Sequence, residues 1–185
     1  MFVKNGFRES PDTAVHILLD SSGSMNDSGL MFANAVCYAV GKALQDISGV
    51  NLGITAFPGA NAAKRGATVV PVLRHGEKLT TRFPEIAYGM TPMAESLWWV
   101  MQQMCLLREN RKIILIITDG EPDSIPAAQE AFKQAQKKGF ECYGLGIMCS
   151  NIATLLPYAS RVIETLPRLA PALFGLLEGA LRRKA

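Results

Sequence analysis

The chain has 185 residues, of which 49% are apolar and 19% are charged, and its formal net charge is +3. This length and composition suit one domain with a substantial core and exclude intrinsic disorder, and the small charge without a basic stripe argues against nucleic-acid binding. The polar N-terminal segment 1–12 and the lack of any run of about 18 apolar residues predict neither a signal peptide nor a membrane span, so a cytoplasmic protein is expected.

Residues that bind soft metals are few. No CxxC pair occurs, so a zinc site is not expected, and the thiols are predicted to be buried and reduced. His16 falls in the middle of an apolar run and is expected to be a hydrogen-bonded core histidine. The residues concerned are Cys37, Cys105, Cys142, Cys149, His16 and His75.

The first half of the chain predicts a strand, a helix and two more strands. Residues 14–20 form a short apolar run that ends in a carboxylate, and residues 29–47 carry apolar positions at helical spacing. Residues 50–57 and 68–73 read as strands. Pro71 lacks an amide donor, so the second of these belongs at a sheet edge, joined to the first by a hairpin.

The middle of the chain predicts a loop, a helix and the most apolar strand. Residues 76–90 are expected to hold a short turn of helix and a loop. A helix then runs from Thr91 to about Leu107, with Pro92 suited to its first position. Residues 112–118 are continuously apolar and rich in β-branched side chains, which is typical of a strand buried on both faces.

The last third continues the alternation of helix and strand. Residues 126–138 form an amphipathic helix that ends at Gly139, and residues 141–147 form the next strand. A short helix near 151–155, a strand near 161–163 and a last helix near 169–183 complete the list.

Strands that alternate with helices predict an α/β fold with a doubly wound, mostly parallel sheet, one antiparallel edge strand and helices on both faces. No repeat or interdomain linker occurs, so a single domain over residues 1–185 is expected, with its core at about 13–183.

Three oxygen-rich segments follow strands or open a helix, at residues 20–24, 89–92 and 118–120. In open α/β sheets the carboxyl ends of the strands form the ligand site, so these segments are expected to meet there. Their hydroxyls and carboxylates form a hard, all-oxygen shell suited to Mg²⁺, with Mn²⁺ or Ca²⁺ as alternatives. The predicted metal ligands are Asp20, Ser22, Ser24, Thr91 and Asp119.

Each of these residues also has a simpler interpretation. Ser22 and Ser24 could cap the first long helix, Thr91 could cap the helix that follows it, and Asp119 could be a turn residue before Gly120. Their joint occurrence favours the metal site. Nearby Asp27, Glu121 and Asp123 are expected to be solvated loop acids that line the rim at most, and Met25, Met90 and Met93 either form an apolar collar for a partner or pack in the core.

The segments DSSGS at 20–24, GMTP at 89–92 and ITDG at 117–120 together resemble the metal-ion-dependent adhesion site of von Willebrand factor A domains. The resemblance implies that Ser22, Ser24 and Thr91 ligate directly, while Asp20 and Asp119 act partly through water and partly by orienting hydroxyls. Residues 91–104 and 111–124 look most like intracellular bacterial or phage members, those of cobaltochelatase and those that work beside MoxR-type AAA+ ATPases. Such a relative would be a non-enzymatic accessory of an AAA+ ATPase.

The expected function is cation-dependent binding of a protein partner that presents a carboxylate to the metal. A Mg²⁺-dependent hydrolase or phosphotransferase that uses Ser22 or Asp20 is the second possibility, but no Gly-x-Ser-x-Gly or phosphate-binding loop occurs. A scaffold subunit with a purely structural metal is the third.

Overall fold

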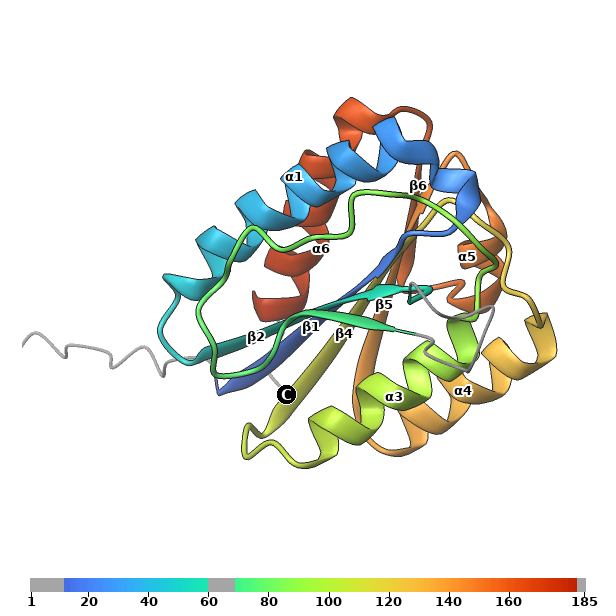
Figure 1. Ribbon diagram of the computed structural model, residues 1–185. Coiled ribbons are helices and arrows are strands. Elements are labelled where there is room, and N and C mark those ends of the chain that lie inside the picture. Colours follow the sequence, from blue (N-terminus) through green and yellow to red (C-terminus); the bar gives the residue numbers. More distant parts are fainter. Residues whose placement is uncertain (1–11, 60–68, 183–185) are drawn as a thin grey trace, which may run out of the picture.

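The computed structural model describes residues 12–59 and 69–182. Six strands form one mixed sheet in the order β3-β2-β1-β4-β5-β6, and every neighbouring pair is parallel except β2 and β3 (Figure 1). The strands are β1 (Thr13–Asp20), β2 (Val50–Phe57), β3 (Val70–Leu73), β4 (Arg111–Thr118), β5 (Phe140–Ile147) and β6 (Ser160–Ile163).

Helices cover both faces of this sheet. In the described residues they are α1 (Asn26–Gln45), α3 (Met93–Cys105), α4 (Ile125–Lys137), α5 (Asn151–Leu155) and α6 (Leu169–Arg182), with two 3₁₀ turns, η1 (Gly23–Met25) and η2 (Leu166–Arg168). Helices α1 and α6 pack together on one face, and α3, α4 and α5 lie on the other (Figure 1). The predicted doubly wound α/β fold is confirmed, including the antiparallel edge strand with Pro71.

The central strands are mostly apolar because both of their faces are buried. Alternate residues of β1 enter different core clusters: Val15 and Ile17 pack beneath α1 and α6, whereas Ala14 and Leu18 pack against α3 and α4. Strand β4 divides in the same way. This two-sided burial explains why these strands show no alternation of polar and apolar residues.

Residues 76–90 contain no helix, so the predicted helical turn is wrong. Side chains of α1 hold this segment in an irregular course along the helix. Asn34 Nδ2 donates to the carbonyl of Pro84 at 2.7 Å, and the amide of Ala87 donates to Asp27 Oδ1 at 2.9 Å. These bonds satisfy backbone groups that a helix would have paired internally.

His16 is buried in β1 with its hydrogen bonds satisfied, as predicted. Its Nε2 lies 2.9 Å from Thr55 Oγ1 and its Nδ1 lies 3.0 Å from His75 Nε2. Gly53 provides the room, because a Cβ at that position would lie 2.6 Å from both ring nitrogens of the His16–His75 contact. The four cysteines of the chain are free.

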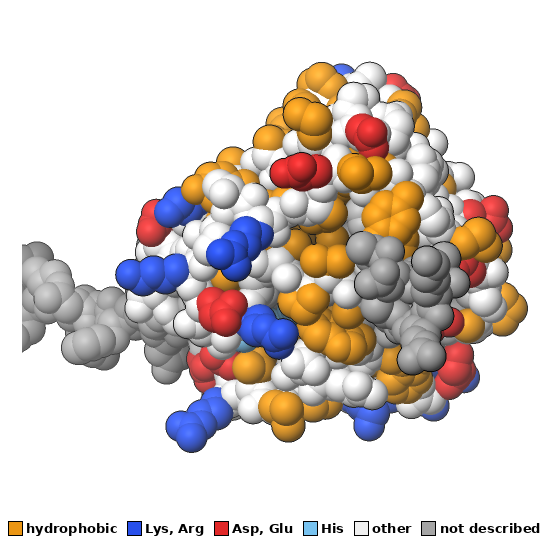
Figure 2. Space-filling model, viewed as in Figure 1, with side chains coloured by type: hydrophobic (Ala, Val, Ile, Leu, Met, Phe, Trp, Pro, Cys, Tyr) orange, Lys and Arg blue, Asp and Glu red, His pale blue; other side chains and the backbone are white. Residues whose placement is uncertain are grey.

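The strand order reverses direction between β1 and β4, so their carboxyl ends flank a topological switch point. On the face seen in Figure 2, Lys and Arg side chains gather toward the left, over the ends at which β1 and β2 begin. They therefore lie away from the carboxyl ends of the strands. Within the described ranges, no helix is long and apolar enough to cross a bilayer.

Candidate metal centre

The first loop of the site begins where β1 ends. Asp20 is fully buried, and its Oδ1 accepts a hydrogen bond of 2.8 Å from the amide of Ser22. The amide of Ser21, which directly follows Asp20, donates to the carbonyl of Phe57 at 2.6 Å and links the loop to the end of β2. These bonds turn the chain sharply into η1 and direct the hydroxyls of Ser22 and Ser24 toward each other, 3.1 Å apart.

The second loop lies against the first through backbone contacts. The amide of Gly23 donates to the carbonyl of Gly89 at 3.3 Å, and the amide of Tyr88 donates to the carbonyl of Ser21 at 3.1 Å. Gly89 has a φ of +77°, a conformation that residues with a Cβ rarely adopt. Thr91, two residues later, is thereby placed beside the serine-rich turn.

The third loop follows β4 and joins the first through two side-chain bonds. Ser24 Oγ donates to Asp119 Oδ1 at 2.7 Å, and Thr118 Oγ1 donates a short hydrogen bond to Asp20 Oδ2. Because β1 and β4 are parallel neighbours, Asp20 and Asp119 emerge at the same edge of the sheet. All five predicted ligand residues therefore come from loops that meet there.

Gly120 marks the point where the oxygens converge. A Cβ built on it would lie 3.1 Å from Ser24 Oγ, 3.2 Å from Thr91 Oγ1 and 3.6 Å from Asp20 Oδ2. Oxygens from the first and second loops thus surround one small space beside Gly120 of the third loop, and a larger residue at that position would fill it. The sequence predicted that Thr91 meets the serine-rich turn, and in the structure Thr91 Oγ1 and Ser24 Oγ lie beside the same space.

The site has a buried floor and an open rim. Asp20, Ser22 and Thr91 are buried, Asp119 is half-buried and Ser24 is exposed. Burial raises the pKa of the Asp20 carboxyl to about 6, against the opposing effect of its hydrogen bonds from Ser22 and Thr118, and burial likewise raises the pKa of Asp119. In the described part of the chain neither carboxylate has an ion pair with a basic side chain. The site therefore concentrates uncompensated negative charge.

The donor set fits a hard divalent cation. Two carboxylates and three hydroxyls offer only oxygen, which suits Mg²⁺, Mn²⁺ or Ca²⁺. Across residues 12–59 and 69–182 no group of three or more His, Cys, Asp or Glu side chains could hold a metal by itself, so the hydroxyls are essential to any ion bound here. A metal here would be held by Ser22, Ser24 and Thr91 together with Asp20 and Asp119.

The simpler interpretation of the hydroxyls as helix caps does not describe the structure. Ser22 precedes η1 but its side chain makes no capping bond, and Met25, which precedes α1, makes none. Pro92 is the residue before α3, so the predicted helix start is displaced, and Thr91 Oγ1 faces the site instead of the helix. None of the three hydroxyls is thus used to cap a helix, and the hydroxyls of Ser22 and Ser24 bond to other residues of the candidate site.

Sequence reasoning missed three residues that hold the site together. Thr118 orients Asp20. Asp123 Oδ1 accepts from the amide of Thr91 at 2.7 Å, and Asp27 anchors the second loop through Ala87. Asp27 and Asp123 are exposed, as expected of solvated loop acids, but their hydrogen bonds to the second loop were not foreseen from the sequence. Of the three methionines considered as a collar, Met25 and Met93 are buried, and Met90 is 69% exposed.

Comparisons with known proteins agree with this geometry. The family model described as "von Willebrand factor type A domain" matches residues 14–170. No curated protein sequence matches the chain. The chain spans 30% of a pilus adhesin and less than half of a mussel byssus protein among the solved structures that it resembles.

Three solved structures illustrate the shared fold. The pilus adhesin SpaC of Lactobacillus rhamnosus GG, in an open conformation, has a TM-score of 0.78 at 14% identity over 94% of this chain and 30% of the adhesin. The mussel proximal thread matrix protein 1, whose MIDAS motif is occupied by zinc, has a TM-score of 0.74 at 11% identity over 93% of this chain and 46% of that protein. Manganese-loaded TRAP of Plasmodium vivax has a TM-score of 0.67 at 12% identity, over 91% of this chain and 74% of that one.

None of these three is a cobaltochelatase or an AAA+-associated protein, so they lend no support to that finer resemblance. The family model covers most of the chain. The chain therefore belongs to the von Willebrand factor type A domain family.

Proposed function

We propose that this protein is a divalent-cation-dependent protein-binding module, in which Asp20, Ser22, Ser24, Thr91 and Asp119 hold Mg²⁺ and a carboxylate of a partner completes the metal's coordination. The observation that carries the proposal is the convergence of oxygens from the first and second loops on the space beside Gly120 of the third, where Asp119 Oδ1 is bonded to Ser24 Oγ. Oxygen atoms from distant loops gather here, and none of the described residues forms an ion pair with them. A hard metal ion stabilises such an arrangement.

The balance of charge supports binding of an acidic partner. Neutral hydroxyls ligate a metal without cancelling its charge. A divalent cation that is bound mainly by hydroxyls therefore remains electrophilic. Ser24 is exposed and Asp119 is half-buried, so the metal would face solvent on the side of these two residues. A carboxylate arriving from that side would form a strong charge-assisted contact.

The solved relatives support a metal at this position. The mussel protein carries zinc in its MIDAS motif, and TRAP of Plasmodium vivax is loaded with manganese. Mg²⁺ is proposed for this chain because the five candidate ligands offer only oxygen atoms and include neither His nor Cys. Mn²⁺ and Ca²⁺ also prefer oxygen ligands.

The site offers little to a hydrolase. Both histidines of the chain are engaged with each other, and His16 stands four residues before Asp20 along β1, about 13 Å away. Neither histidine therefore lies within hydrogen-bond reach of the Ser24 hydroxyl, which bonds to Asp119 Oδ1 and Ser22 Oγ. We therefore propose binding without catalysis.

Metal binding is tested by isothermal titration of the chain with Mg²⁺ and with Mn²⁺. Thr91→Val removes one hydroxyl and keeps the shape of the side chain, so its affinity for Mg²⁺ should fall at least tenfold. Thr80→Val is the matched control, because Thr80 is exposed and lies outside the candidate site, earlier in the segment between β3 and α3. Equal affinities in the wild type and Thr91→Val would refute the assigned metal site.

Partner binding is tested by a pull-down with the immobilised chain in Mg²⁺, followed by elution with EDTA. The partner should be retained by the wild type and by Ser150→Ala, whose serine is exposed outside the site, and lost with Ser24→Ala. If EDTA lowers the melting temperature and leaves every interaction intact, the metal is structural only. The finer resemblance to intracellular members suggests a MoxR-type AAA+ ATPase or its substrate as the partner in the cytoplasm, and the identity of the eluted proteins decides that point.

A further inference from the structure

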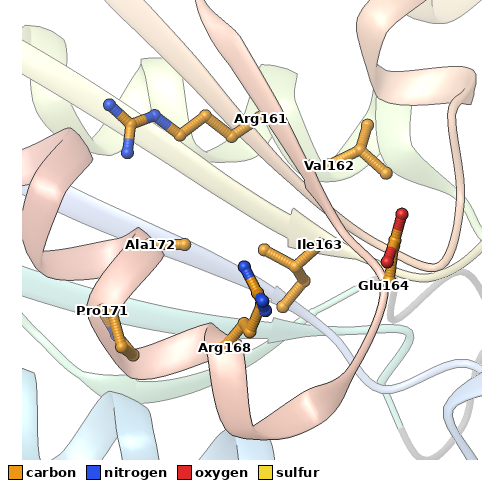
Figure 3. Close-up of a pocket in the computed structure, with 7 residues that line it drawn as sticks. All are labelled: Arg161, Val162, Ile163, Glu164, Arg168, Pro171 and Ala172. Carbon is orange, nitrogen blue, oxygen red and sulfur yellow. The ribbon is translucent and has the colours of Figure 1, made fainter.

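A second surface, remote from the metal loops in sequence, has the features of a binding site for an extended acidic segment. An open pocket of about 660 Å³ lies between β6 and the start of α6 (Figure 3). Its lining residues are Arg161, Val162, Ile163, Glu164, Arg168, Pro171 and Ala172.

Strand β6 is the last strand of the sheet and pairs only with β5 among the described residues. The amide of Gly144 donates to the carbonyl of Ala159, and the amide of Met148 donates to that of Ile163. Because backbone groups alternate in direction along a strand, the N–H and C=O of Val162 point away from β5. The described part of the chain gives them no partner, so they are available to another strand.

The side chains of β6 divide the pocket into two faces. Arg161 and Ile163 lie on the side of α6, together with Arg168, whereas Val162 and Glu164 lie on the opposite side of the strand (Figure 3). A strand added to this edge would place alternate side chains over the two arginines and the intervening ones over Val162 and Glu164.

The two arginines are exposed and have no ion pair with the described residues. Arg161 lies against α6, since a Cβ on Gly175 of that helix would be 3.1 Å from Arg161 Nη1. Glu164 is the only acidic residue in the pocket, and it lies on the other face. The face toward α6 is therefore positively charged next to free backbone donors and acceptors.

We infer that the edge of β6 binds an extended segment of a partner protein, which adds as a seventh strand. Carboxylates at alternate positions of that segment contact Arg161 and Arg168, and apolar or basic residues between them face Val162 and Glu164. Such strand addition draws its affinity from backbone hydrogen bonds and its specificity from alternate side chains. The site is separate from the metal centre and needs no metal.

The test uses an acetylated and amidated hexapeptide, Thr-Asp-Val-Asp-Lys-Thr, titrated into the full chain in EDTA and followed by the amide signals of β6 in NMR spectra. The control peptide, Thr-Asp-Asp-Val-Lys-Thr, has the same charge but directs its two carboxylates to opposite faces. The alternating peptide should bind at least fivefold more tightly and should slow hydrogen exchange at the amide of Val162.

Variants separate the charge from the backbone contribution. Arg161→Ala with Arg168→Ala should weaken binding roughly 25-fold, about fivefold for each exposed charge. Arg82→Ala with Arg108→Ala removes two exposed arginines elsewhere and should leave binding unchanged. Two peptides N-methylated on alternate residues test the strand pairing without altering the protein. One of them should lose binding and the other should keep it.

Four outcomes would overturn the inference. The first is no binding of the alternating peptide, and the second is equal binding within either pair of peptides, the alternating peptide and its control or the two methylated forms. The third is displacement of the peptide by inorganic phosphate at equal concentration, and the fourth is loss of binding in Thr91→Val. The last would mean that the peptide occupies the metal centre. Melting curves of the arginine variants confirm that a loss of binding is not a loss of fold.

Discussion

Ser24 Oγ donates a 2.7 Å hydrogen bond to Asp119 Oδ1, although 95 positions of sequence separate the two residues. The bond joins the loop after β1 to the loop after β4. It sets two candidate metal ligands at contact distance in a chain that has no basic side chain beside them in the described ranges. The bond therefore holds the loops after β1 and β4 together at the candidate metal centre, where the Asp119 carboxylate has no ion pair with a described residue.

Asp20→Asn should stabilise the metal-free protein. Asp20 is fully buried with no cationic partner, so the amide removes an uncompensated buried charge, and the gain in the free energy of unfolding should be about 1–3 kcal/mol in EDTA. The same variant should lose the stabilisation of about 2.7 kcal/mol that the wild type gains at a Mg²⁺ concentration of 100 times its Kd. Urea denaturation in EDTA and in Mg²⁺ measures both effects, and a variant that still responds to Mg²⁺ would contradict the role of Asp20.

Asp123 should act on metal binding through Thr91. Its Oδ1 accepts from the Thr91 amide, and its own amide donates to the Thr91 carbonyl at 3.0 Å. Asp123→Ala releases the loop and should weaken Mg²⁺ binding about tenfold, since residues that orient metal ligands commonly contribute that much. Asp123→Asn keeps the acceptor and should bind nearly as the wild type does. If both variants lose affinity equally, the charge of Asp123 matters and not its hydrogen bond.

The His16–His75 pair should make stability fall in acid. Burial lowers the pKa of His16 well below 6.5, with the charge of His75 as the second cause. The pKa of His75 is also lowered by burial, while its bond to the Asn51 carbonyl and the charge of Glu109 oppose that shift. Arg74 lines the same cavity. The folded state thus favours the neutral rings, so their contribution is complete above the unfolded pKa and is lost as pH falls below it.

The expected loss is about 2 kcal/mol between pH 6.5 and pH 5 for a histidine that stays neutral when folded. Urea denaturation in the Asp20→Asn background isolates this effect, because Asp20 makes the free energy of unfolding change with pH in the opposite direction. The pKa of Asp20 is raised to about 6, so its carboxyl destabilises the metal-free fold as pH rises through that value. His16→Gln in this background should be less stable at pH 7 but show a flatter dependence on pH. Parallel curves would contradict the assignment to His16.

Two glycines should respond in opposite directions to alanine. A Cβ on Gly146 in β5 would lie 2.2 Å from the carbonyl oxygen of Cys149, which is backbone and cannot move aside, so Gly146→Ala should cost about 2–4 kcal/mol of stability. A Cβ on Gly179 in α6 meets nothing within 4 Å, and Gly179→Ala should add about 0.5–1 kcal/mol. Urea midpoints of the two variants check both signs.

The sequence by itself determined the elements and the motifs. Continuous apolar runs predicted β1 and β4, because strands buried on both faces cannot alternate, and Pro71 predicted the edge position of β3. The ends of β1 and β4 also placed Asp20 and Asp119 at one edge of the sheet, since parallel strands end on the same side.

Only the tertiary structure decided the contacts that no local pattern encodes. Thr91 reaches the serines through the backbone bond between Gly23 and Gly89, and Asp123 acquires its role from a bond formed 32 positions away. The segment 76–90 has no helix because side chains of α1 satisfy its backbone. Likewise, Arg161 and Arg168 come to share a pocket only because α6 folds back beside β6. Local sequence sets which elements form, whereas the packing of distant elements sets which side chains meet.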